Sequence, residues 1–235
     1  MKPIILINRS LIISGDVSFE KLPELLRATY DLSHVGGYKV PALAGRVGWE
    51  RWIEEIRKYT TKPILYDHQK LGTDTPHTAK PMIKELKAAG FDAVFLYPLS
   101  GPDTQSALIQ AAKEEELGVI VGGLMTHDHY LRSEQGFIAD EAVLEIYTKA
   151  LELGITNFGV PSNKLREVKI IRETLESQGV EPIFYFIGLG PQGGSLPLPK
   201  EVTGEKWHVI VGRDIHSSSS PRQSALEYIV KIEKN

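Results

Sequence analysis

Short segments rich in β-branched and aromatic residues alternate with amphipathic segments along the whole chain of 235 residues. This order predicts strands that are each followed by a helix, which is the pattern of a parallel sheet. Eight such units favour a closed (β/α)8 barrel, the TIM barrel, over a doubly wound sheet, because 14–16 lacks the Gly-rich turn expected after the latter's first strand. We expect strands at 11–14, 37–40, 63–67, 93–97, 119–123, 156–160, 182–187 and 208–211, with an extra strand or a cover at 3–7.

The composition limits the kinds of partner. With 27 basic and 30 acidic residues the chain has a formal net charge of −3 and no basic run, which gives no reason to expect nucleic acid or an anionic membrane as a partner. The chain has no cysteine, so thiolate chemistry and disulfides are excluded. No apolar run approaches the roughly 20 residues that span a bilayer. We therefore expect one soluble, cytoplasmic domain over 1–235 that binds a small molecule.

Charged residues follow the third predicted strand directly. Asp67, Lys70 and Asp74 lie within eight residues, just before Pro76 begins a helix. Charges at a strand end are costly unless they are paired or hydrated, and the carboxyl ends of TIM-barrel strands face the active site. The cluster therefore indicates a functional site, and a surface turn with an incidental ion pair is the plainer alternative.

Two further charged residues lie at the ends of the first two strands. Lys39 interrupts an otherwise apolar strand, and a buried lysine needs a partner, for which Asp67 on the adjacent strand is the natural choice. The alternative is a lysine that faces solvent. Asp16 follows the first strand, where Asp16 or Ser18 could instead serve only as the N-cap of a helix over 19–30.

The fifth predicted strand ends in Thr126-His127-Asp128-His129. A His-x-His pair in an extended segment places both imidazoles on one side, which suits zinc, copper or iron. Other possible ligands are Asp67 and His68, but Lys70, which is close to them in the sequence, would repel a dication. We therefore expect no metal. Thr126 is the more informative residue, because its hydroxyl can both donate and accept a hydrogen bond at a polar ring edge.

Glycine-rich segments follow the last two strands, at 188–194 and at 212. Glycines let backbone N–H groups approach an anion closely, and TIM barrels commonly bind phosphate with the loops after strands seven and eight. Arg213 adds a permanent positive charge with a geometry suited to phosphate. The two segments together predict one phosphate site.

These segments resemble one enzyme family from Tyr38 onward: orotidine 5′-monophosphate decarboxylase, within the wider group of phosphate-binding decarboxylase barrels. The segments at 190–194 and 211–215 resemble its two phosphate loops almost residue for residue, and 74–78 is similar to its Asp-Ile-Pro-x-Thr motif. The resemblance implies a homodimeric TIM barrel that forms UMP and CO₂ from orotidine monophosphate in de novo pyrimidine biosynthesis, with no metal and no organic cofactor.

The resemblance also implies roles for individual residues. The implied alternating charge network consists of Lys39, Asp67, Lys70 and Asp74. Asp74 and Thr78 would reach into the partner's site, and Lys70 would stabilise the carbanion and protonate it. Thr126 would meet the pyrimidine edge. The residues implied at the phosphate are Gln192, Gly193, Gly212 and Arg213.

The chain departs from the family pattern at two places. The family motif is Asp-x-Lys-x-x-Asp, whereas the segment from Asp67 to Asp74 carries two additional residues, so that either Asp67 or His68 could be the first carboxylate-position residue. The family's ribose-binding aspartate falls near Ser14 or Asp16, and we take Asp16 as the candidate.

Two other functions fit the same sequence. One is a magnesium-dependent sugar-phosphate decarboxylase or aldolase of the same barrel group. The other is a barrel that binds a phosphate ligand without catalysis, because the altered Asp/Lys spacing has abolished the chemistry.

Overall fold

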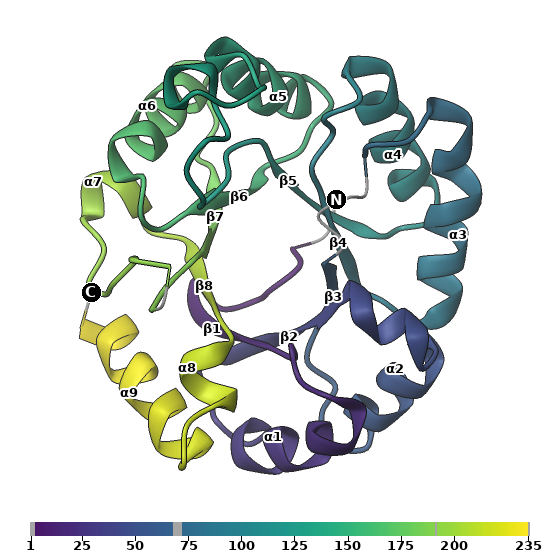
Figure 1. Ribbon diagram of the computed structural model, residues 1–235, viewed down its shortest axis with the longest axis vertical. Helices are drawn as coiled ribbons and strands as arrows, with labels where there is room; N and C mark the ends of the chain where they lie inside the picture. The colour runs from purple at the N-terminus through teal and green to yellow at the C-terminus, as the bar shows by residue number, and fades with distance from the viewer. Residues whose placement is uncertain (1–2, 68–71, 191, 235) are drawn as a thin grey trace.

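The computed structural model describes residues 3–67, 72–190 and 192–234. Eight parallel strands form a closed barrel in which each strand pairs with the next and β1 pairs with β8. Figure 1 shows the ring of strands with the helices outside it. The strands are β1 (Arg9–Ser14), β2 (Val35–Pro41), β3 (Ile64–Asp67), β4 (Ala93–Leu96), β5 (Gly118–Gly122), β6 (Asn157–Pro161), β7 (Ile183–Ile187) and β8 (Trp207–Val211). The predicted TIM barrel is confirmed, and every predicted strand boundary lies within two residues of the observed one.

Helices cover the outside of the barrel. The α-helices are α1 (Leu22–Thr29), α2 (Trp49–Arg57), α3 (Ala79–Ala89), α4 (Pro102–Glu114), α5 (Asp140–Glu152), α6 (Leu165–Glu176), α7 (Lys200–Thr203), α8 (Arg213–His216) and α9 (Pro221–Lys234). The 3₁₀ helices are η1 (Phe19–Lys21), η2 (Ala42–Arg46), η3 (Pro76–Thr78) and η4 (Arg132–Glu134). Proline begins α4 and α9, because its fixed φ suits the first helical position and its missing N–H costs no bond there.

The core has two layers. The larger one lies between the sheet and the helices, where helix faces such as Trp52, Ile53 and Ile56 of α2 are buried. The smaller one fills the barrel interior with inward-facing residues such as Ile12 and Phe95. Within the described residues no helix is long and apolar enough to cross a membrane.

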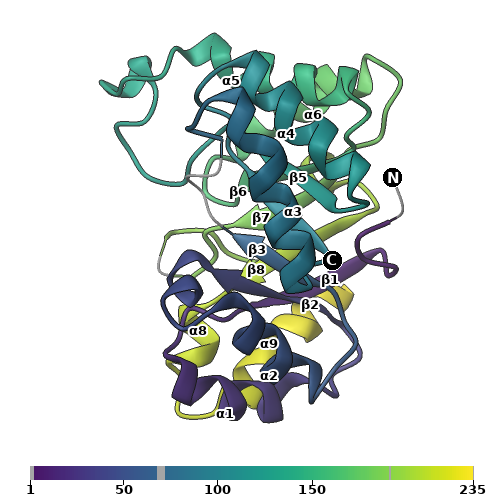
Figure 2. The same cartoon turned by 90° about the vertical axis from the view of Figure 1, so that its right-hand side faces the viewer.

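The N-terminal segment closes the amino end of the barrel. Residues 3–7 form no strand, and Ile4 and Ile5 join the interior core. Figure 2 shows the N-terminus at one end of the barrel, while the connection between β5 and α5 projects from the other. The sequence left two possibilities for this segment, and the cover is the one observed.

Buried polar groups lie beside this cover. Ser10 Oγ and His208 Nδ1 share a hydrogen bond of 2.7 Å between β1 and β8. The Tyr185 ring packs against the imidazole with a centroid separation of 4.8 Å. Burial lowers the pKa of His208 to about 3, because a charged imidazole would be poorly solvated there. His208 is therefore neutral in the folded protein at neutral pH.

Candidate active site

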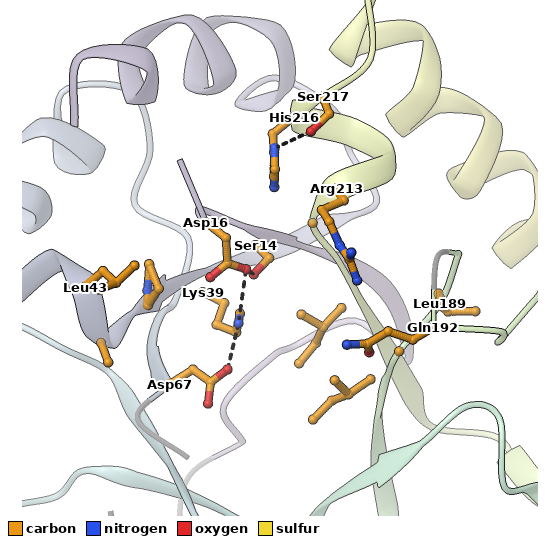
Figure 3. A pocket seen from close by; sticks show the side chains of 16 residues that line it. Ser14, Asp16, Lys39, Leu43, Asp67, Leu189, Gln192, Arg213, His216 and Ser217 are labelled. Atoms are coloured by element: carbon orange, nitrogen blue, oxygen red, sulfur yellow. Dashed lines mark hydrogen bonds and ion pairs between the residues drawn. The ribbon is translucent and has the colours of Figure 1, made fainter. Parts of the chain in front are cut away.

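A cavity of about 730 Å³ opens at the carboxyl ends of the strands (Figure 3). Active sites of TIM barrels lie at this end of the barrel. Charged and polar groups from the ends of β1, β2, β3, β7 and β8 line it. They include Ser14, Asp16, Lys39, Asp67, Gln192, Gly212, Arg213 and His216. Six of these eight were predicted as site residues from the sequence; the other two are Ser14, the alternative to Asp16, and His216.

Lys39 lies at the centre of the charged wall. Its side chain is only 11% exposed, and its Nζ lies 2.7 Å from Asp67 Oδ2 and 3.5 Å from Asp16 Oδ2. Burial alone would lower the pKa of Lys39, but the two carboxylates outweigh it and raise that pKa above its ordinary value. The ammonium is therefore fixed in its charged form, and the predicted pairing of Lys39 with Asp67 is confirmed.

Asp16 faces the cavity and does not cap the following helix. Ser14 Oγ donates a hydrogen bond of 2.5 Å to Asp16 Oδ2, and the same carboxylate oxygen approaches Lys39. Ser18 occupies the N-cap of η1 without a side-chain capping bond. Ser14 and Asp16 thus form one unit at the cavity wall, so both candidates for the ribose-contact position are present together.

Asp67 uses only one of its two carboxylate oxygens within the described residues. Its Oδ2 accepts from Lys39, whereas Oδ1 is buried and has no hydrogen-bond partner there. A buried carboxylate oxygen without a partner is costly. Oδ1 is therefore an acceptor that a ligand or a further side chain can satisfy. Lys70 and His68 lie outside the described residues.

Asp74 and Thr78 do not line the cavity of their own chain. Asp74 Oδ1 accepts from the Thr75 N–H at 2.7 Å, and Thr78 Oγ1 donates to Thr75 O at 2.8 Å. The segment is attached to the connection after β4: Ser100 N–H donates to Gly72 O, and a Cβ at Gly72 would lie 2.7 Å from Tyr97 O. The predicted role of this pair in a partner subunit's site stays a prediction.

The loop after β7 is closed by its own backbone. The N–H of Gly193 donates to Gly190 O at 2.8 Å, and that of Gly194 donates to Gly188 O at 3.1 Å. Gly193 does not line the cavity, whereas Gly188, Leu189 and Gln192 do. The resemblance implied Gly193 at the phosphate; in this structure its N–H is used within the loop, because the chain turns back on itself there.

The loops after β7 and β8 touch at one point. Gly190 has a φ of +77°, and a Cβ at this position would lie 2.2 Å from Asp214 Oδ2. Asp214 is held in turn by Tyr228 of α9, whose hydroxyl donates to Oδ2 at 2.7 Å. Asp214 thereby fixes the turn at Gly190 relative to Arg213, which follows β8. The two segments that the sequence assigned to one anion site do lie together.

Thr126 lies beside the cavity wall and not in it. Its Cγ2 lies 2.7 Å, and Gln192 Oε1 lies 2.9 Å, from the position that a Cβ on Gly188 would occupy. Asn163 connects the same two loops, because its Nδ2 donates to Thr126 O at 2.9 Å and to Gln192 O at 3.1 Å. Sequence reasoning missed Asn163; its signal was a polar residue two positions beyond β6.

His127 and His129 belong to a loop that is held by other contacts. His129 Nδ1 bonds to Glu134 O at 2.8 Å, and the His127 ring packs edge-on against Tyr130. The Glu134 carboxylate pairs with Lys164 and accepts from the N–H groups of residues 130 and 131. Across the described ranges, no three His, Asp or Glu side chains form a group that could hold a metal ion.

A closed barrel with a fixed lysine–carboxylate group facing an arginine–glutamine wall defines this protein as an enzyme of the TIM-barrel class. The model of the Orotidine 5′-phosphate decarboxylase / HUMPS family matches residues 25–228. The chain belongs to that family.

Similar proteins support this membership. The chain is 29% identical over 183 residues to an orotidine 5′-phosphate decarboxylase of Methanocaldococcus jannaschii, covering 77% of this chain and 79% of the relative. It is 31% identical over 185 residues to one of Pyrococcus abyssi, covering 77% and 78%.

A solved structure is similar over nearly the whole fold. It is an orotidine 5′-monophosphate decarboxylase of M. jannaschii complexed with inhibitor BMP, with a TM-score of 0.81 and 24% identity over 96% of this chain and 99% of that one. The structure of the Pyrococcus horikoshii enzyme gives a TM-score of 0.74 at 23% identity, over 95% and 99%.

Proposed function

We propose that the protein is an orotidine 5′-phosphate decarboxylase that forms UMP and CO₂ in the cytoplasm, without metal or organic cofactor. The observation that carries the proposal is the buried ammonium of Lys39, held between Asp67 and Asp16 in the cavity that Arg213 also lines. The curated relatives named above carry the same activity in their names.

The phosphate of the substrate is assigned to the wall formed by Gln192, Gly212 and Arg213. The guanidinium supplies a permanent positive charge, and the Gln192 amide supplies a neutral donor from the facing loop. Binding energy from this remote group positions the pyrimidine over the charged wall. Such energy accelerates the reaction when it is used to bring the reacting carbon into place.

The chemical step is assigned to Lys70. The bond between the pyrimidine and its carboxylate breaks, CO₂ leaves, and the electron pair stays on the ring carbon. At about 4 Å and an effective dielectric near 20, one ammonium stabilises that carbanion by on the order of 4 kcal/mol. The same ammonium then transfers its proton to the carbon. Lys39 holds the carboxylate of Asp67 in place at the end of β3.

We assign the complete site to a homodimer. Asp74 is exposed and Thr78 half-buried, and neither lines the cavity of its own chain. In the proposed dimer they complete the site of the partner subunit. Sedimentation of the purified protein, with and without orotidine monophosphate, measures whether the dimer forms.

The first test is turnover of orotidine monophosphate in excess chelator, followed by ultraviolet absorbance. Activity that persists with chelator supports the proposal. No turnover in the wild-type protein contradicts it. A parallel assay of a sugar phosphate with added magnesium and with chelator tests the magnesium-dependent reaction, because the family to which the chain belongs also includes HUMPS. Tight UMP binding with no turnover of orotidine monophosphate or of a sugar phosphate would identify a non-catalytic barrel.

A further inference from the structure

His216 is a second basic side chain on the arginine wall of the cavity. It ends α8, three residues after Arg213, and both residues line the cavity. Residues three apart on a helix lie on the same side of it. Figure 3 shows the imidazole pointing into the cavity near Asp16, with the Arg213 side chain beside it. The assignment of the site above gives this residue no role.

One ring nitrogen of His216 lacks a partner. Nδ1 shares a hydrogen bond of 3.1 Å with Ser217 Oγ, whereas Nε2 is buried and bonds to none of the described residues. Nε2 lies 3.7 Å, and Asp16 Oδ2 lies 3.4 Å, from the position that a Cβ on Gly212 would occupy, so both atoms lie close to the backbone that precedes Arg213. Buried polar atoms in folded proteins are usually bonded. The partner missing here is one that a ligand can supply.

The surroundings keep the imidazole neutral while the site holds no anion. Burial lowers the pKa of His216 below its ordinary value; Asp16, on the connection after β1, opposes this, while Arg213 on α8 and Lys21 on η1 lower it further. The net direction is downward, so the ring carries no proton on its second nitrogen at neutral pH. An anion bound at Arg213 would add negative charge close to the same ring and reverse this direction.

We propose that His216 is a phosphate-binding residue, and that it takes up a proton when a phosphate monoester dianion binds beside Arg213. The nucleotide's identity rests on the proposed function, but the phosphate contact does not. In the bound state Nε2 donates a charge-assisted hydrogen bond to a phosphate oxygen. The proton comes from solvent, and no covalent bond changes.

Calorimetry with UMP and with inorganic phosphate tests this proposal. Titrations at pH 7.5 in two buffers of different ionisation enthalpy measure the protons exchanged on binding. We expect uptake approaching one proton per site. UMP itself would release a proton if its own ionisation changed, since the second pKa of a phosphate monoester is about 6. The sign of the exchange therefore distinguishes His216 from the ligand.

The variant His216→Gln keeps a neutral donor and removes the titrating group. It should lose the proton uptake and bind UMP roughly tenfold more weakly, which corresponds to one hydrogen bond to a charged group. The matched control is His34→Gln, because His34 pairs with Glu233 outside the cavity. His34→Gln should change neither the proton uptake nor the affinity for UMP. Unchanged uptake in His216→Gln would overturn the proposal.

The wild-type protein provides a test that does not depend on the variant folding. Because binding takes up a proton, UMP affinity should fall as the pH rises from 6.5 to 8.5, by at most tenfold per pH unit. A flat profile would overturn the proposal. Neither measurement uses turnover. A protein that binds phosphate with proton uptake but does not decarboxylate orotidine monophosphate would retain this role for His216 and lose the proposed function.

Discussion

Two sets of buried polar atoms, one at each end of the barrel, differ in whether they have hydrogen-bond partners. At the amino end, Ser10 and His208 bond to each other beneath the N-terminal cover. At the carboxyl end, Asp67 Oδ1 and His216 Nε2 are just as inaccessible, yet neither has a partner among the described residues. The barrel thus carries a closed polar pair at its amino end and these two unsatisfied groups at its carboxyl end.

The difference separates stability from function. A satisfied buried pair contributes to folding, and breaking it leaves an unpaired group in the interior. An unsatisfied group costs stability in the free protein and gains its partner when a ligand binds. Changes at Asp67 or His216 should therefore alter turnover or affinity, and changes at the Ser10–His208 pair should alter unfolding.

Lys70→Ala should have the largest effect. Loss of about 4 kcal/mol of carbanion stabilisation lowers kcat for orotidine monophosphate by about a thousandfold, while UMP binding is largely retained. The control is Lys80→Ala, which removes an exposed lysine paired with Glu114 on the helical surface and should leave kcat unchanged. A Lys70→Ala enzyme with wild-type kcat would contradict the proposed role.

Arg213→Ala should come next. Removal of the guanidinium weakens phosphate binding, so we expect KM to rise roughly a hundredfold. Arg222→Ala is the matched surface control, since Arg222 pairs with Asp31 outside the cavity. Steady-state kinetics of both variants would show the effect, and equal KM values would remove Arg213 from the phosphate site.

Gly190→Ala and Gly193→Ala form a matched pair at the same loop. Both glycines have positive φ, so alanine costs each about 1–2 kcal/mol. Only Gly190 has the Asp214 carboxylate where the new Cβ must go, while Gly193 has its nearest neighbour 3.9 Å away. Denaturant unfolding should show a loss of about 2–3 kcal/mol for Gly190→Ala and less for Gly193→Ala. Equal losses would mean that the contact with Asp214 does not fix the turn.

His208 should give the smallest effect, confined to stability at acid pH. Its folded-state pKa of about 3 lies below the value near 6.5 in the unfolded chain. The unfolded state binds the proton first, so this contribution to stability is complete above pH 6.5 and is lost as the pH falls toward 3. The slope approaches about 1.4 kcal/mol per pH unit.

Denaturant unfolding of wild type and His208→Asn at pH 6 and pH 5 measures that slope. The variant should show a shallower pH dependence and an unchanged kcat near neutral pH. A change in kcat would show that the amino end influences the site.

Features that depend on the local sequence pattern, or on the order of the strands along the chain, were predictable. The strands followed from apolar runs of the correct length, and the pairing of Lys39 with Asp67 followed from their places at the ends of adjacent strands. The neighbouring position of the two glycine-rich loops followed from the order of strands in a closed barrel.

Other contacts depend on geometry that no local pattern encodes. Ser10 and His208 are 198 residues apart and meet only because the barrel closes. Asn163 acts through backbone carbonyls of two other loops, which the sequence does not distinguish from any other carbonyl. Gly193 was implied at the phosphate by the family resemblance, but the fold of the loop decides which N–H groups are used within it.

The pairing of β1 with β8 also determines when the protein can finish folding. Arg9 pairs with Trp207, so one edge of β1 stays unpaired until β8 has been synthesised. At 5–20 residues per second, the roughly 200 residues that separate Arg9 from Trp207 take roughly 10–40 s to synthesise. For most of that time β1 has an unpaired edge, which can join another chain. Expression at a lower growth temperature, or with additional chaperone, should therefore increase the soluble yield of this protein. The stability of the folded protein should not change.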